Sequence, residues 1–597
     1  MQKEKNNQFG NLPQWDLSDL YSGIDSPQFK QDLESAKSDA KSFEGNYKNK
    51  LEDLAKAGSL LEALKSYESL SDLTGRLGSF AFLNYAQKTD DANRAKFMGD
   101  CQEALTNLST NLIFFSLELN QIDEDVLEAA LNNDKELARY RYWFKELRKS
   151  KPYQLEERIE ELFHDKSITG RTAWNRLFDE TMASLKFDVA GESLGLEATL
   201  NLLTDKSEKK RKSGFEAIVK TLKDNQRLFT HITNVLAKDK EISDRWRKFE
   251  DIADSRHLAN SVEREVVDAL EQAVRQAYPR LSHRYYKMKA KWLGKEQLEA
   301  WDRNAPLPTS EEQLYDWDSA TKIVLDAYGD FSPELAELAK PFFNSGWIDA
   351  EVKQGKSPGA FAHPTVPSAH PYLMLNYLGK PRDVMTLAHE LGHGVHQRLA
   401  AKQGALMAST PLTLAETASV FGEMLTFQSL LENAKDKKQR FAMLSQKVED
   451  MLNTVVRQIA FYSFERKVHT ARRKGELKAE QIDAMWLEVS KESLGDGVIL
   501  NEGYESFWAY IPHFIHSPFY VYAYAFGDCL VNSLYAKYQE NPRGFAEKYL
   551  ELLAAGGSKH HSELLKPFGL DASDKDFWLL GLNMIEAMID ELENLSD

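Results

Sequence analysis

The sequence is poor in cysteine and has no long uncharged apolar run. Only two cysteines occur in 597 residues, Cys101 and Cys529, and neither belongs to a cluster of potential metal ligands. The sequence therefore argues against a disulfide-bonded scaffold and against a cysteine-ligated zinc site. No apolar run reaches the length of a membrane span, so we expect no membrane partner.

An excess of basic residues is also lacking. The chain has 75 Lys and Arg against 92 Asp and Glu, which gives a formal net charge of −17. This balance argues against nucleic acid or an anionic membrane surface as the main partner. The basic cluster at residues 209–212 is therefore interpreted as a solvated helix face. Residues 1–7 lack the apolar core of a signal peptide, which with the few cysteines predicts a reducing, cytoplasmic setting.

Internal repeats, low-complexity tracts and Pro/Ser-rich linkers are missing as well. Over residues 26–166 apolar residues recur at helical spacing, as at Leu70, Leu77 and Phe80, which predicts a helical bundle without catalytic residues. A Gly-containing turn predicts a small hairpin over residues 187–196. A soft boundary near residue 205 divides the chain into an N-terminal helical domain, residues 1–205, and a catalytic domain, residues 206–597.

The sequence does contain two histidines at the spacing of a metal site. Residues 386–396 read Thr-Leu-Ala-His-Glu-Leu-Gly-His-Gly-Val-His. Residues four apart share one helix face, so His389 and His393 can bind one ion, and Glu390 can hold a metal-bound water. Metal-assisted peptide hydrolysis needs this arrangement. His396 shares the face, but a fourth protein ligand would close the open position, so we assign it to packing or support of the ligands.

The ends of this helix and its glycines carry further predictions. Asp383 is the expected N-cap, and Gly404 is expected to close the helix. Gly392 and Gly394 each cost about 1 kcal/mol relative to alanine inside a helix. We therefore expect another backbone, or a substrate, to come close to the helix at these positions.

Glu416 is the candidate third metal ligand. It follows the two-histidine helix after a short loop and opens the apolar stretch 418–431. The alternative is a capping box, because Thr413 and Glu416 form the pattern Thr-x-x-Glu, in which the glutamate binds its own helix start. The nearby histidines favour the ligand. Ala418 and Ser419 are small, so the two helices can approach closely.

Glu423 lies seven residues beyond Glu416, on nearly the same helix face, among apolar residues. A buried carboxylate at this position would orient a ligand histidine. The alternative, a surface glutamate, stays open.

Two short segments break the helical pattern before the helix that carries His389 and His393, which we call the metal helix. Residues 359–364 and 371–377 are rich in Gly, Pro and aromatic residues, which predicts a small sheet whose edge faces the site. An exposed sheet edge binds a peptide by main-chain hydrogen bonds and recognises backbone rather than sequence. The alternative is a hairpin that only braces the metal helix.

Tyrosines and two histidines crowd residues 501–528. Tyr and His side chains can donate hydrogen bonds to an oxyanion, a role worth about 3–4 kcal/mol per donor in other hydrolases. The alternative is that most of these aromatic residues belong to the core. Farther along, His560 and His561 follow two glycines and a serine and are interpreted as a loop and helix start rather than a metal site.

These segments together resemble the oligoendopeptidase F and thimet oligopeptidase family of zinc metallopeptidases, and above all its bacterial oligoendopeptidase F branch. The resemblance is specific over residues 359–528 and looser over most of the chain. Its clearest motifs are Met374–Gly379, Asp383–His396, Glu416–Ser419 and Pro518–Gly527.

The resemblance implies a mainly α fold: a large, clamp-like, zincin-type metallopeptidase with a small β-sheet beside the metal helix and the metal in a deep channel. It implies a zinc-dependent endopeptidase that hydrolyses internal bonds of oligopeptides by metal-activated water attack. One Zn²⁺ ion would be bound by His389, His393 and Glu416. Glu390 would be the general base that takes a proton from the water.

In this family the region around residues 501–528 supplies a histidine and tyrosines that face the zinc. His513, Tyr520 and Tyr524 match those residues best. His516 lies close to His513, so which of the two histidines faces the zinc stays open.

Two other functions fit the same residues. An aminopeptidase or carboxypeptidase needs a group that captures a peptide terminus, and the sequence has no motif for one. A helical peptide-binding scaffold with a structural zinc normally has four protein ligands, and only three are evident. Cobalt or manganese in place of zinc is also compatible with the sequence.

Overall fold

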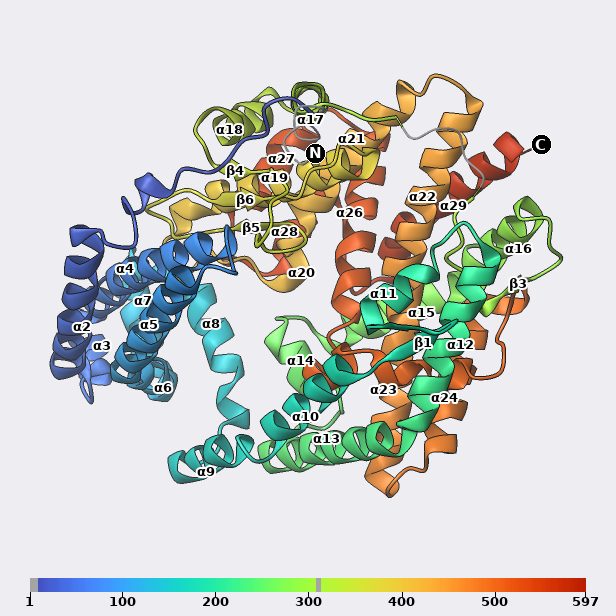
Figure 1. Ribbon diagram of the computed structural model, residues 1–597. Coiled ribbons are helices and arrows are strands. Elements are labelled where there is room, and N and C mark those ends of the chain that lie inside the picture. Colours follow the sequence, from blue (N-terminus) through green and yellow to red (C-terminus); the bar gives the residue numbers. More distant parts are fainter. Residues whose placement is uncertain (1–8, 308–312, 597) are drawn as a thin grey trace. The chain divides into compact units, whose positions relative to one another are not determined.

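The computed structural model describes residues 9–307 and 313–596, and most of this chain is helical (Figure 1). The chain forms two compact units. Unit 1 is drawn from residues 1–151, 311–433 and 537–570, and unit 2 from residues 152–310, 434–536 and 571–597. The division predicted near residue 205 stays a prediction. Residues 1–7, on which the signal-peptide argument rests, lie outside the described residues.

Unit 1 contains a helical N-terminal part and a second part with a sheet. Its α-helices are α2 (Pro27–Tyr47), α3 (Leu51–Ala57), α4 (Leu60–Ala86), α5 (Ala92–Ser109), α6 (Ile113–Gln121), α7 (Glu124–Asn133), α8 (Arg141–Lys149), α17 (Trp317–Phe331), α18 (Pro333–Asn344), α19 (Pro381–Ala400), α20 (Leu412–Ala415), α21 (Thr417–Glu432), α27 (Phe545–Ala554) and α28 (His561–Leu565).

Unit 2 is also mainly helical. Its α-helices are α9 (Glu157–Ser167), α10 (Arg171–Ser184), α11 (Leu196–Leu202), α12 (Glu208–Asp224), α13 (Gln226–Arg247), α14 (Asp254–Ala259), α15 (Arg264–Ala277), α16 (Ser282–Trp292), α22 (Lys437–Thr454), α23 (Val456–Lys474), α24 (Ala479–Leu494), α25 (His513–His516) and α29 (Lys575–Ser596). The residues of α26 (Tyr522–Glu540) are divided between the units.

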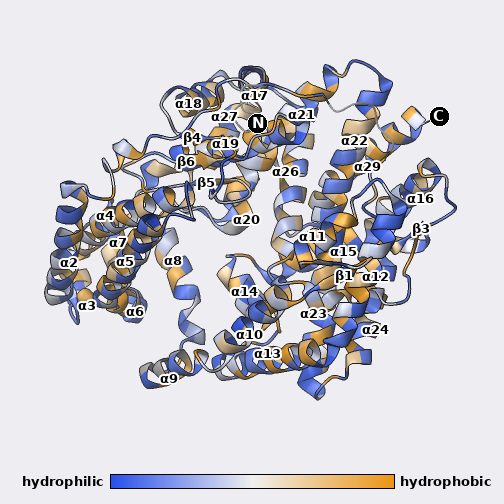
Figure 2. Cartoon of the chain, viewed as in Figure 1, coloured by the Kyte–Doolittle hydropathy of each residue, from blue (hydrophilic) through white to orange (hydrophobic). Residues whose placement is uncertain are grey.

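The apolar stripes predicted from helical spacing form the cores. On α4, Leu70, Leu77 and Phe80 are buried, as predicted, and Leu73 packs against them. Hydrophilic and hydrophobic residues alternate along the helices of both units (Figure 2). Burying one stripe per helix is the main source of stability in such a fold, because isolated helices are marginal in water.

A small three-stranded sheet lies beside α19 in unit 1 (Figure 1). Its strand order is β4 (Ile348–Asp349), β6 (Tyr372–Met374), β5 (Phe361–His363), with β6 parallel to β4 and antiparallel to β5. The central strand β6 is fully buried, and β5 is an edge strand. Both strand segments predicted next to the metal helix are therefore confirmed.

Unit 2 carries two shorter pairings. The hairpin predicted over residues 187–196 is present as β1 (Phe187–Val189) and β2 (Glu192–Leu194). The second pair is parallel and consists of β3 (Leu298–Glu299) and β7 (Val498–Ile499).

Helix α19 begins earlier than the sequence predicted. Pro381 is its first residue and Lys380 its N-cap, so the assignment of Asp383 as N-cap was wrong. Proline is favoured at the first helical position because its missing N–H needs no partner there. The Asp383 carboxylate instead accepts the backbone N–H of Leu378 at 2.9 Å and of Lys380 at 3.1 Å. At the other end a 3₁₀ turn leads to Gly404, which adopts φ 86°.

Neighbours come close to both glycines of α19, but only at Gly392 is the neighbour another backbone, as predicted; at Gly394 it is a side chain. A Cβ at Gly392 would lie 2.4 Å from the carbonyl oxygen of Ala418 and 2.7 Å from the Cα of Ser419. The neighbour is thus the backbone of α21. A Cβ at Gly394 would lie 2.6 Å from the ring of Phe342.

Two further observations concern membranes and thiols. Over residues 9–307 and 313–596, no helix combines the length and the apolar character that crossing a membrane requires. Cys101 in unit 1 and Cys529 in unit 2 are both buried free thiols.

The Gly392 contact leads to a prediction about stability. Gly392→Ala should lower the free energy of unfolding by about 1–3 kcal/mol, because the added methyl group meets backbone that cannot rotate away. Gly99 of α5 is the matched control, since a Cβ there meets no atom within 4 Å. Gly99→Ala should leave stability unchanged or raise it by up to about 1 kcal/mol. Urea unfolding of both variants measures the difference, and equal midpoints would contradict the close-contact argument.

Candidate metal centre and catalytic residues

The three predicted metal ligands come together in unit 1. The Nε2 atoms of His389 and His393 each lie 3.5 Å from Oε2 of Glu416. Bonds of 2.0–2.1 Å at tetrahedral angles place two zinc ligand atoms about 3.4 Å apart. The observed spacing therefore fits one tetrahedral ion held by these three side chains, with a fourth position left for water or substrate.

Glu416 reaches the histidines because it lies at the junction of α20 and α21. It has helical backbone angles between the end of α20 and the first residue of α21. The buried hydroxyl of Thr413 finds no hydrogen-bond partner among the described residues, so the capping box considered as an alternative does not form. The Ser419 hydroxyl donates to Glu416 Oε2 at 2.9 Å and fixes the carboxylate. Sequence reasoning missed this role, although the i, i+3 spacing from Glu416 was a usable signal.

His389 is oriented by Glu423 of α21. Its Nδ1 lies 3.2 Å from Glu423 Oε2, which leaves Nε2 for a metal ion. Burial lowers the pKa of His389, but the hydrogen bond and the charge of Glu423 outweigh it and raise the pKa above its ordinary value. A carboxylate behind a ligand histidine fixes the ring and strengthens it as a ligand. The geometry favours this role over that of a surface glutamate.

His393 and His396 have different environments on the same helix. Burial lowers the pKa of His393 to about 4 against the opposing charge of Glu416, and the backbone of Ala415 acts as a further partner. Neutral imidazole is the form that binds a metal ion. His396 is buried, and its Nε2 lies 3.2 Å from the Thr410 hydroxyl. It therefore packs behind the site, as predicted.

Glu390 is a buried carboxyl group next to the ligands. Only 8% of its surface is exposed, and burial raises its pKa to about 7. The Glu416 charge adds to this rise, whereas His389 and the backbone N–H of Ala362 oppose it. Ala362 is the middle residue of edge strand β5, so the sheet edge faces the site, as predicted. A carboxyl group with a pKa near neutral pH can both accept and release a proton.

A cavity of about 270 Å³ adjoins His393 within unit 1. It is lined by the loop over residues 364–371, by α19 and by residues 405–415. Most of these side chains are small or apolar. A cavity of this size can accept one peptide side chain beside the metal ligands.

The remaining predicted site residues form a second group, in unit 2. The Tyr524 hydroxyl lies 3.2 Å from Nε2 of His513, and the ring of Tyr520 lies 5.3 Å from that of Tyr524 between centroids. His516 has a different partner, because its Nε2 lies 2.8 Å from Oδ1 of Asp179. The structure therefore groups His513, rather than His516, with the two tyrosines.

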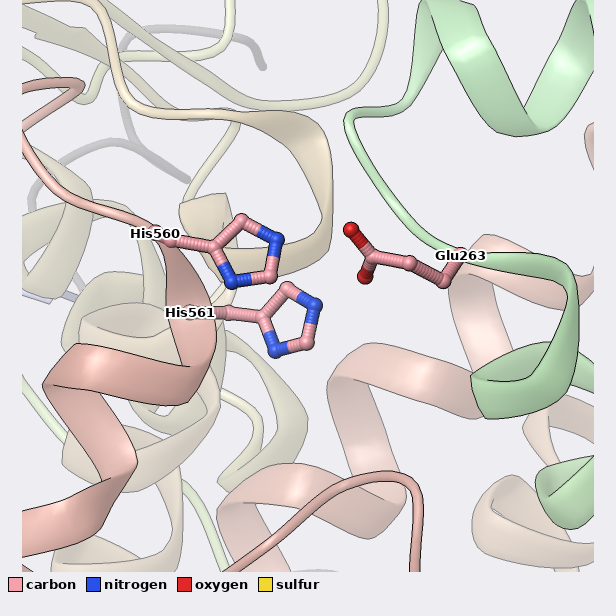
Figure 3. A group of neighbouring side chains, drawn as sticks. All are labelled: Glu263, His560 and His561. Atoms are coloured by element: carbon pink, nitrogen blue, oxygen red, sulfur yellow. The ribbon is translucent and has the colours of Figure 1, made fainter. Parts of the chain in front are cut away.

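The histidines at 560 and 561 are adjacent residues of unit 1 (Figure 3). His560 caps α28, because its side chain accepts the backbone N–H of Ser562, so the predicted loop and helix start is confirmed. Figure 3 also labels Glu263, which belongs to unit 2. Because the three residues do not belong to one unit, we assign no metal site to them.

Comparison with known proteins decides the family. The sequence model of peptidase family M3 matches residues 201–584, which is more than half of the chain, and that of oligopeptidase F matches residues 118–187. The chain belongs to peptidase family M3. This result confirms the resemblance found in the sequence motifs.

Relatives of this M3 peptidase match nearly its whole length. It is 27% identical over 558 residues to oligopeptidase PepF of Bacillus subtilis, covering 92% of this chain and 82% of the relative. It is 26% identical over 591 residues to group B oligopeptidase PepB of Streptococcus agalactiae, covering 98% and 97%. The chain is thus an oligopeptide-cleaving metallopeptidase, as the sequence predicted.

Solved structures confirm the fold. A Chlamydophila abortus protein described as a peptidase superimposes with a TM-score of 0.86 at 23% identity, over 98% of both chains. Oligoendopeptidase F of Enterococcus faecium has a TM-score of 0.71 at 21% identity, over 96% of this chain and 99% of that one. The mainly α fold of this M3 peptidase, with a small sheet beside the metal helix, is therefore confirmed.

The contact between Glu423 and His389 leads to a prediction about metal affinity. Glu423→Ala should weaken binding of a metal ion at these ligands by about 10- to 100-fold, because the His389 ring loses the partner that fixes it. Zinc titration with a competing chelator measures the affinity. Glu432→Ala, at the exposed end of the same helix, is the matched control and should bind zinc like the original protein. Equal affinities in the two variants would remove the orienting role.

Proposed function

We propose that this M3 peptidase is a zinc-dependent endopeptidase whose single ion is bound by His389, His393 and Glu416. The observation that carries the proposal is the 3.5 Å spacing of the Glu416 oxygen from both imidazole nitrogens, which matches a tetrahedral ligand set. Only three protein ligands converge among the described residues, as a catalytic rather than a structural zinc requires.

Glu390 is the proposed general base. A zinc ion bound here would supply Lewis acidity, lowering the pKa of water to about 7 and polarising the scissile carbonyl. The Glu390 carboxylate accepts a proton from the attacking water and later delivers it to the leaving amine. Its position directly after His389 on α19, and its burial beside edge strand β5, support this role.

His513, Tyr520 and Tyr524 are the proposed oxyanion donors. Support comes from the family resemblance of this segment and from the way the three side chains gather in unit 2. A hydroxyl or imidazole N–H aimed at the tetrahedral oxyanion stabilises the transition state more than the substrate. Such donors are expected to affect turnover more than binding.

The proposed substrates are oligopeptides held by their main chain. Strand β5 is at the edge of its sheet, so its outer backbone groups can pair with an extended peptide. The 270 Å³ cavity beside His393 has room for one side chain of that peptide. Main-chain pairing predicts broad sequence tolerance, with any preference set by this cavity. A cytoplasmic location is also proposed, from the composition alone.

An aminopeptidase or carboxypeptidase remains the competing proposal. Either would need a group that binds a free terminus of the substrate. A quenched peptide with both ends blocked distinguishes the activities. An endopeptidase cleaves blocked and free peptides at similar rates, whereas failure on the blocked peptide alone would favour a terminus-dependent enzyme.

The zinc-dependent mechanism is tested by metal removal together with Glu390→Gln. Chelation should abolish cleavage of a quenched oligopeptide, and one equivalent of zinc should restore it. Glu390→Gln should retain one zinc per chain by elemental analysis while kcat falls by about 10²-fold or more, because the general base is lost. Full activity in that variant would exclude Glu390 as the base. Activity that persists without metal would exclude the proposed mechanism.

The second group is tested by Tyr524→Phe. Loss of one oxyanion donor should lower kcat by about 10²- to 10³-fold and leave KM similar. His516→Gln is the matched control, since His516 pairs with Asp179 rather than with the tyrosines, and should keep near-normal kcat. A change in KM alone in Tyr524→Phe would show that this residue only binds substrate.

A further inference from the structure

The segment that carries the proposed oxyanion donors contains an unusual backbone conformation. Phe519 has φ 61°, in the left-handed region that bulky residues rarely adopt. Its side chain is fully buried, with the ring of His469 4.8 Å away and the Lys240 ammonium 5.5 Å from its centroid. Such a conformation persists only where surrounding contacts enforce it. Tyr520, one of the proposed donors, follows directly.

A buried carboxyl group from another element of unit 2 contacts this residue. Glu465, in the middle of α23, accepts the backbone N–H of Phe519 at 2.8 Å. Glu465 is only 2% exposed, and its second oxygen, Oε2, has no hydrogen-bond partner among the described residues. Burial raises the pKa of Glu465 to about 8. A buried carboxyl group is costly, so a structure that keeps one usually uses it.

Helix α14 and the residue after it contact the same segment on both sides of Phe519. The Nε atom of Arg256 donates to the carbonyl of Pro518 at 3.1 Å, and its guanidinium lies 5.7 Å from the ring centroid of Tyr520. Asn260, which follows the last residue of α14, donates to the hydroxyl of Tyr522 at 2.9 Å. These contacts thus hold the Pro518 carbonyl on one side of Phe519 and the Tyr520 and Tyr522 side chains on the other, while Glu465 contacts the left-handed residue itself.

We propose that Glu465 is a positioning residue that holds Phe519 in its left-handed conformation and thereby aims Tyr520 and Tyr524. If the Phe519 N–H lost its acceptor, the residue would relax toward an ordinary negative φ and turn the chain at the point where Tyr520 begins. Tyr524 would move with it, because its ring packs on Tyr520. This inference rests on the proposed oxyanion role of the tyrosines.

The test compares Glu465→Leu with Glu465→Gln. Leucine has a similar size and is apolar, so the variant is expected to fold, but it cannot accept the Phe519 N–H. Glutamine keeps an acceptor oxygen at the same place. We expect Glu465→Leu to lower kcat by about 10- to 100-fold with KM nearly unchanged, as misplaced catalytic groups do, and Glu465→Gln to restore most of kcat.

Two readouts separate positioning from a general loss of structure. Amide hydrogen exchange at Phe519 should be fast in Glu465→Leu and slow in Glu465→Gln, while zinc content stays at one per chain in both. In a double-mutant cycle, Glu465→Leu should add little to the loss caused by Tyr524→Phe, because both act through one side chain.

The outcomes distinguish this proposal from the one on which it rests. Normal kcat in Glu465→Leu together with low kcat in Tyr524→Phe would overturn the positioning role and leave the oxyanion role standing. Normal kcat in Tyr524→Phe would overturn the oxyanion role of Tyr524, and exchange at Phe519 would still decide whether Glu465 holds the segment. A Phe519 amide that stays protected in Glu465→Leu would overturn the proposal outright.

Discussion

The close contact between α19 and α21 is the constraint on which the metal centre depends. Gly392 lies between the two ligand histidines, and the backbone of α21 occupies the space where its side chain would be. A larger residue would push α21 outward and carry Glu416 away from both imidazoles. A third helix supports the pair, because the Tyr328 hydroxyl of α17 donates to the Ala388 carbonyl at 2.6 Å and fills the space at Gly422.

Helix α21 supplies more than a ligand. Glu416, Ser419 and Glu423 are separated by three and four residues, so they share one face of the helix. Glu416 faces the histidines, Ser419 fixes the Glu416 carboxylate, and Glu423 fixes the His389 ring. The candidate third ligand, the side chain that fixes it and the side chain that fixes His389 thus come from one helix and its first turn. Precise ligand geometry follows from helix spacing, which is more reliable than loop geometry for such a site.

Local pattern was enough to predict the candidate ligands, and it offered Glu423 as a support with a surface glutamate as the alternative, but it missed Ser419. His389, His393 and Glu416 follow from spacing, and Gly392 predicted a close backbone because glycine is costly inside a helix. Asp383 was misassigned because Pro381 and Asp383 both mark helix starts, and only the structure shows which residue begins the helix. No local rule predicts the left-handed Phe519, since its cause is a carboxyl group 54 residues earlier in the chain. The assembly of each unit from three stretches is long-range in the same way.

Glu390 and Glu465 are both buried carboxyl groups, but their proposed roles differ. Burial raises the pKa of Glu390 to about 7 and that of Glu465 to about 8, and in both cases desolvation is the largest cause. Glu390 lies beside the proposed metal ligands, and its proposed proton partners are the attacking water and the leaving amine. Glu465 instead accepts a backbone N–H, and its second oxygen has no hydrogen-bond partner among the described residues. A neutral acid suits that task, because accepting one hydrogen bond needs no charge, and the nearby positive charges of Arg256 and Lys240 offset only part of the cost of burying a charged carboxylate. The free-energy cost of burying Glu465 is therefore best explained by its proposed role in holding Phe519 in the left-handed conformation.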